Sequence, residues 1–176
     1  INKSERIVFE NENIIGSISL NGAIIDDLTF KKYTTSVEGT EKVTLLNPKE
    51  IKTGYYIDSG WAINNNDVET PNNKTVWEVD GNNKLTPSTP VKLKWTNNNI
   101  TFEKIIKLDN KFLFNIEQKI INNSDKTYNF YPYGQIIRNK SPEVTNFYIL
   151  HEGLLGVFDD QLVEQDYKDI EEKKYS

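Results

Sequence analysis

Residues 91–108 read VKLKWTNNNITFEKIIKL, and this stretch decides the fold class. Val91, Leu93 and Trp95 alternate with two lysines, which is the two-residue period of a strand with one apolar and one solvated face. The three asparagines that follow tolerate the positive φ that a tight hairpin turn demands. A second strand is expected over Ile100–Leu108, so the stretch predicts an antiparallel hairpin.

Similar alternating segments fill most of the chain. We predict further strands over Ile14–Leu20, Ala23–Phe30, Tyr55–Ile63, Phe112–Ile120, Tyr128–Ile137 and Phe147–Leu150. Turn signals rich in Asn, Asp and Gly separate them, as at Asn21-Gly22 and Asp109-Asn110. This pattern indicates an all-β, antiparallel sandwich or barrel. A short helix is expected only within Asp159–Tyr175, and Thr70–Pro90, with its three prolines, predicts a mobile loop.

Composition narrows the function classes. A length of 176 residues suits a single domain over residues 1–176. A formal net charge of −5 argues against non-specific binding to nucleic acid or to an anionic membrane, which needs a basic field. The chain has no cysteine and one histidine, which excludes disulfides, thiolate metal sites and histidine-rich metal sites, so we expect no cofactor. It has no methionine and begins at Ile1, so we expect a piece of a longer reading frame.

The densest candidate for chemistry is His151 beside Glu152, just before Gly153. A general acid–base pair needs two titratable groups that face one substrate. Adjacent residues of a strand point to opposite faces, so these two could serve one site only where the backbone bends. We therefore favour a histidine that anchors the loop by bonding a backbone carbonyl. The carboxylate pairs Asp26-Asp27 and Asp159-Asp160 could flank a glycosidic bond, but turn and strand-end roles are commoner for such residues.

Aromatic side chains offer a second kind of candidate. Trp61, Trp77, Tyr131 and Tyr133 could line a groove and stack on a sugar or an extended peptide. Alternating aromatics in an all-β chain are more often core residues or cross-strand pairs, and Trp95 is expected in the core for that reason.

Ordered motifs along the chain resemble one family. The stretch IIGSISLNGAIIDDLTFKKY, residues 14–33, is similar to the opening of the large periplasmic domain of YidC, the bacterial Oxa1-type membrane protein insertase. Further matches follow in the family's order, at Tyr56 with Gly60-Trp61, Thr101–Lys104 with Leu108-Asp109, Phe112–Phe114 with Ile121–Ser124, Tyr133-Gly134 with Arg138, His151–Gly153 with Gly156, Leu162–Glu164 and Tyr167–Ile170. The His-Glu-Gly form resembles the alphaproteobacterial branch. Their order over nearly the whole chain carries the resemblance.

The resemblance implies a β-supersandwich of the galactose mutarotase-like kind, on the periplasmic face of the bacterial inner membrane. It implies a parent that inserts and folds inner-membrane proteins, and an accessory role for this domain in contacting Sec translocon accessory subunits or nascent membrane proteins. It brings no catalytic residue and no cofactor to this chain, so we expect no enzyme. The family domain continues with more strands past the position of Ser176, so the chain is expected to hold its N-terminal and central part.

Two other readings stay open at this point. A carbohydrate-binding or mutarotase-like sugar-active domain would share the architecture, but fold likeness alone does not carry function. Mutarotase-like enzymes use a histidine and a carboxylate from separate strands, whereas the single histidine here falls in the YidC-like motif. A groove that binds extended polypeptide by adding a strand to an exposed sheet edge is the third reading.

Overall fold

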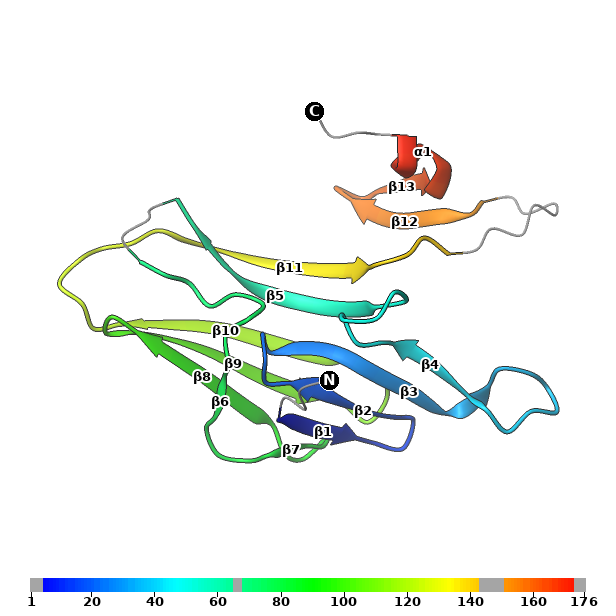
Figure 1. Ribbon diagram of the computed structural model, residues 1–176, viewed down its shortest axis with the longest axis horizontal. Coiled ribbons are helices and arrows are strands. Elements are labelled where there is room, and N and C mark those ends of the chain that lie inside the picture. The colour runs from blue at the N-terminus through cyan, green and yellow to red at the C-terminus, as the bar shows by residue number, and fades with distance from the viewer. Residues whose placement is uncertain (1–4, 65–67, 143–150, 173–176) are drawn as a thin grey trace. The chain divides into compact units, whose positions relative to one another are not determined.

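The computed structural model describes residues 5–64, 68–142 and 151–172. Its contacts divide the chain into two compact units, Ile1–Asn139 and Lys140–Ser176 (Figure 1). Nearly all regular structure is β, which confirms the predicted all-β class.

The first unit holds a seven-stranded sheet. Its strands are β1 (Arg6–Glu10), β2 (Ile14–Ser19), β3 (Ile24–Thr34), β4 (Lys42–Leu46), β5 (Tyr55–Ile63), β7 (Lys84–Leu85) and β11 (Phe130–Arg138). The order is β11-β5-β3-β2-β1-β7, with β4 also paired to β3. All its pairs are antiparallel except β1 with the short β7.

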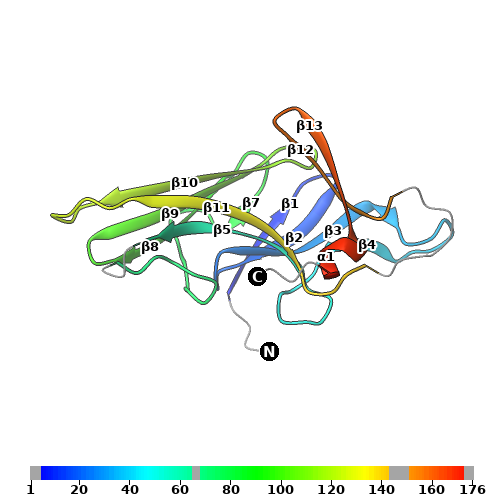
Figure 2. The same cartoon turned by 90° about the horizontal axis from the view of Figure 1, so that it is seen from above.

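The same unit holds a four-stranded antiparallel sheet of β6 (Glu78–Val79), β8 (Val91–Asn97), β9 (Ile100–Leu108) and β10 (Phe114–Asn122). The stretch that predicts a hairpin forms β8 and β9, and Asn98 and Asn99 both have positive φ in the turn between them. Figure 2 shows the long strands β5, β9, β10 and β11 lying along roughly the same axis, with β5 antiparallel to β11 and β9 antiparallel to β10.

The two sheets share one apolar core. Buried side chains come from both, including Ile7, Phe9, Ile18 and Trp61 from the larger sheet and Leu93, Phe102 and Ile106 from the smaller. Ring contacts join the sheets, with 5.1 Å between the centroids of Phe9 and Phe114 and 5.2 Å between those of Trp61 and Phe102. Period-2 strands form this sandwich because each has one apolar face to bury.

The second unit is a hairpin followed by a short helix. Strands β12 (Gly153–Phe158) and β13 (Gln161–Asp166) pair around Asp159 and Asp160, whose φ values are both positive. This confirms a turn role for that carboxylate pair. The helix α1 spans only Tyr167–Glu172, because the preceding residues 161–166 form the strand β13. The predicted strand Phe147–Leu150 lies outside the described residues.

Two sequence predictions need correction, and some strands were not predicted. The strand expected from Phe112 begins at Phe114, because residues 109–113 turn back on themselves through a bond from the Asp109 N–H to the Leu113 carbonyl. The segment Thr70–Pro90 is not one loop, since it contains β6, β7 and the buried Trp77. Strands β1, β4, β12 and β13 were not predicted from the alternation.

Candidate functional site

The most unusual residue of the sandwich interior is Lys104, whose relative exposure is 1%. It lies on the inward face of β9, between the buried Phe102 and Ile106. Its Nζ donates a hydrogen bond to the carbonyl oxygen of Ser59 on β5, 2.5 Å away, and lies 5.1 Å from the ring centroid of Trp77. A buried ammonium is costly unless it is paired, and here a carbonyl and an aromatic face offset part of that cost.

Burial also changes the acid–base properties of this region. It lowers the pKa of Lys104 to about 8, although the Asp58 carboxylate acts in the opposite direction. Burial raises the pKa of Asp58 above its ordinary value, and Lys104 opposes that shift. The two groups are therefore electrostatically coupled across the space between β5 and β9.

Gln118 extends this cluster from the next strand. It is the direct register partner of Lys104, and its Nε2 donates to the Gly60 carbonyl at 2.8 Å. Lys104 and Gln118 thus bind two consecutive carbonyls of β5. These carbonyls lie beyond the one register pair that joins β5 to β3, at Ile57. The two side chains tie the β5–β11 edge of the larger sheet to the smaller sheet.

Tyr133 approaches the cluster from β11. It is the cross-strand partner of Gly60, and a Cβ on Gly60 would lie 2.7 Å from the Tyr133 hydroxyl oxygen. The glycine is therefore what lets the tyrosine lie against β5. Burial, and after it the Asp58 carboxylate, raises the pKa of Tyr133. Tyr131, two residues earlier on β11, is 52% exposed.

The structure brings together part of the predicted groove. Trp61 and Trp77 stack with ring centroids 6.4 Å apart, but both are buried in the core. Within the described residues, the Trp77 indole N–H has no hydrogen-bond partner. Trp61, Trp77 and Tyr133 all border the Lys104 cluster. Whether these residues or Tyr131 bind a ligand stays a prediction.

Sequence reasoning missed Lys104, Gln118 and Asp58. One signal was available, because Lys104 stands at an inward position of an otherwise apolar alternation from Ile100 to Leu108. No comparable signal marks Gln118 or Asp58. Their roles depend on which strands face each other across the sandwich.

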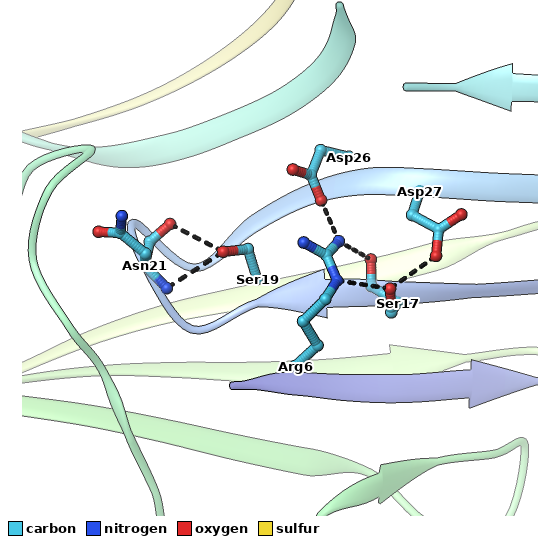
Figure 3. A network of polar contacts seen from close by, with 6 residues as sticks. All are labelled: Arg6, Ser17, Ser19, Asn21, Asp26 and Asp27. Atoms are coloured by element: carbon cyan, nitrogen blue, oxygen red, sulfur yellow. Dashed lines mark hydrogen bonds and ion pairs between the residues drawn. The ribbon is translucent and has the colours of Figure 1, made fainter. Parts of the chain in front are cut away.

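A second polar cluster explains the carboxylate pair Asp26-Asp27 (Figure 3). Asp26, only 2% exposed, forms an ion pair with Arg6. Arg6 Nε donates to the Ser17 hydroxyl at 2.7 Å, and that hydroxyl donates to Asp27 at 2.6 Å. An irregularity between β2 and β3 leaves Asp26 as an extra residue beside Asp27. This network links β1, β2 and β3.

His151 and Glu152 lie in the second unit. The His151 Nδ1 is 2.9 Å from a carboxylate oxygen of Asp166, and the Tyr167 N–H donates to the Glu152 backbone carbonyl at 3.1 Å. Both contacts close the open end of the β12–β13 hairpin. The histidine is therefore an anchor, and within the described residues its partner is a carboxylate, whereas we expected a backbone carbonyl.

Two features are absent from residues 5–64, 68–142 and 151–172. No group of three metal-ligating side chains occurs there, and none of the helices found there is long and apolar enough to cross a membrane.

Comparison with known proteins decides the family. Residues 6–176 match the family described as the YidC periplasmic domain. The chain belongs to this family. It is 56% identical over its full length to the membrane protein insertase YidC of Pelagibacter ubique, covering 32% of that protein. It is 42% identical over 99% of its length to YidC of Brucella melitensis, covering 29% of it. For YidC of Rickettsia bellii the identity is 38% over 98% of the chain and 31% of the relative.

These matches confirm the resemblance to YidC and its alphaproteobacterial character. The chain spans about a third of the length of the curated relatives that it matches. As a YidC periplasmic domain it lies on the periplasmic side of the inner membrane. The relatives carry the name of an insertase, in agreement with the expectation that the chain is not an enzyme.

Proposed function

We propose that this chain is an accessory contact module of a protein that inserts and folds inner-membrane proteins. The match of residues 6–176 to the YidC periplasmic domain carries the proposal. Insertion itself would belong to the parts of the parent outside this chain. The proposed partners are nascent membrane proteins and accessory subunits of the Sec translocon.

The outer part of the β5–β11 edge supports a contact role. β11 ends the larger sheet in the described structure, so one side of it has no neighbouring strand there. It presents Tyr131 and Ile136, which are both exposed and which, five positions apart, lie on opposite faces of the strand. Tyrosine is enriched at protein interfaces because it offers a large rigid contact area together with a hydroxyl. Lys104 and Gln118 bind the carbonyls of β5, the strand that pairs with β11, so the exposed side of β11 is preorganised.

Nothing in the described residues favours the carbohydrate reading. Its best stacking candidates, Trp61 and Trp77, are buried against each other and against Phe102 or Lys104. Stacking on a sugar needs an exposed aromatic face.

The test removes this domain from the parent and keeps the membrane helices. We expect insertion of a reporter membrane protein to continue at a large fraction of its normal rate. Complete loss of insertion at normal parent abundance would contradict an accessory role.

A second experiment addresses the contact itself. A photo-crosslinking residue at Tyr131 should capture nascent membrane proteins or Sec accessory subunits, whereas one at the exposed Val76 should capture neither. Equal capture at both positions would contradict a contact face on β11.

A further inference from the structure

One end of the sandwich carries an exposed apolar patch outside the buried core. It consists of Tyr33 near the end of β3 and of Phe112 and Leu113 in the turn before β10, exposed by 56%, 47% and 68%. Phe30 lies between them and makes edge-to-face contacts, 5.5 Å from the Tyr33 ring and 6.0 Å from the Phe112 ring. These three exposed residues, on the base of Phe30, are the end patch.

The turn that carries Phe112 and Leu113 is held firmly. Asn11 donates from Nδ2 to the carbonyls of Asp109 and Lys111, both at 2.9 Å. The Asp109 carboxylate accepts the backbone N–H groups of Lys111 at 2.8 Å and Leu113 at 2.9 Å. Two apolar side chains are therefore presented to solvent by an ordered turn, so binding them costs little conformational entropy.

Three lysines are adjacent in sequence to residues of the end patch. Lys31 and Lys32 directly precede Tyr33, and Lys111 directly precedes Phe112. Lys32 Nζ binds the Asn13 side-chain oxygen at 2.8 Å, and Asn13 in turn donates to the carbonyl of Asn110. The nearby Glu10 is already paired with Lys31 at 3.0 Å, and Glu12 is exposed. Lys32 and Lys111 are both exposed, so two cations at this end can reach an anionic group although the net charge of the chain is −5.

We propose that the end patch docks this domain on the outer leaflet of the inner membrane. Phe112 and Leu113 enter the headgroup region, Tyr33 lies at its boundary, and Lys32 and Lys111 contact lipid phosphates. Aromatic and apolar side chains flanked by lysine are the combination that binds membrane interfaces. The patch is small, and a free domain would bind weakly. A periplasmic domain tethered to an inner-membrane parent is held close to the lipid surface, so weak binding to lipid is enough to keep the end patch docked.

The absence of cysteine in this chain allows a site-specific test. The parent, freed of any other cysteine, carries Leu113→Cys labelled with an environment-sensitive fluorophore. It is reconstituted in nanodiscs of phosphatidylethanolamine and phosphatidylglycerol. The matched control is Val76→Cys, which is 69% exposed and belongs to a different part of the sandwich.

We expect the label at residue 113 to shift to the blue and to be quenched several-fold more by spin-labelled lipid than the label at residue 76. Lys32→Glu with Lys111→Glu should reduce that quenching, while unchanged melting temperatures show that the variants are folded. Equal quenching at the two positions would overturn the proposal. So would a blue shift at residue 113 that appears only with a nascent chain and without lipid quenching, because the end patch would then bind protein.

Discussion

Lys104 and Gln118 face each other on neighbouring strands and donate hydrogen bonds to the consecutive carbonyls of Ser59 and Gly60. One side chain is a buried cation and the other a neutral amide, yet they perform the same task. Both join the smaller sheet to β5. Because only Lys104 titrates, its share of this connection depends on pH.

The first prediction concerns Lys104→Met. The folded-state pKa of about 8 lies below the usual 10.5, so burying the charged form lowers stability by about 3 kcal/mol below pH 8. Methionine removes that cost but leaves the Ser59 carbonyl without its donor, which costs about 1–3 kcal/mol. We expect the variant to be as stable as the parent sequence, or slightly more so, at pH 7.

At alkaline pH the difference in the free energy of unfolding between Lys104→Met and the wild type changes in favour of the wild type. Between pH 8 and 10.5 the unfolded chain holds a proton on Lys104 that the folded chain has lost, so the wild-type lysine gains relative stability as pH rises. Guanidinium unfolding at pH 7 and pH 10 should show the stability difference moving toward the wild type by up to about 3 kcal/mol. A stability difference that does not change with pH would show that the pKa of Lys104 is not lowered in the folded protein. Tyr133 titrates in both proteins and cancels in the comparison.

The second prediction concerns Gly60→Ala. The added Cβ would lie 2.7 Å from the Tyr133 hydroxyl and 2.9 Å from its Cζ, so the tyrosine must move away from β5. We expect a loss of about 1–3 kcal/mol in the free energy of unfolding. In a Tyr133→Ala background the same change should cost clearly less, as a double-mutant cycle would measure. Equal costs in both backgrounds would place the strain elsewhere.

The third prediction concerns the buried pair of Arg6 and Asp26. Arg6→Ala leaves a carboxylate that is 2% exposed without its cation, and we expect a loss of about 2–4 kcal/mol, discounted because Arg6 is itself partly exposed. The control is Lys94→Ala, whose partner Glu78 lies 3.9 Å away and is largely exposed. That change should cost less than about 0.5 kcal/mol. Chemical denaturation of both variants measures the two losses in the free energy of unfolding. Similar losses for Arg6→Ala and Lys94→Ala would contradict the prediction.

The fourth prediction concerns Asn11, whose side-chain amide makes two hydrogen bonds as a donor and two as an acceptor. Its Nδ2 binds two carbonyls of the 109–113 turn, and its Oδ1 accepts the N–H groups of Asn13 and Ile14. Asn11→Ala should cost about 2–4 kcal/mol, since the freed turn groups lose partners. The amides of Lys111 and Leu113 should exchange much faster with solvent. Asn13→Ala, which removes an exposed bond to Asn110, should leave those two amides protected.

Local sequence pattern was sufficient for much of the fold. Tyr55–Ile63 and Ile100–Leu108 form strands over the predicted bounds, because alternation specifies a half-buried strand without reference to its partner. The turn at Asn98-Asn99 follows from the ability of asparagine to adopt positive φ. Strands β6 and β7, two residues each, are not visible this way, because they exist only through β8 and β1.

The candidate site was less predictable. Tyr133 and the two tryptophans could be named from residue type, but their burial depends on which strands cover them. The extra position of Asp26 arises from a register shift between β2 and β3, which a period of two does not encode. The strand class, the turns and the family could be predicted from the order of residues alone, because they depend on local period and ordered motifs. The contacts of Lys104 with Ser59 and of Gln118 with Gly60 could not be predicted in this way, because they join residues 45 and 58 positions apart. Strands so distant in sequence meet only when both sheets bury one core.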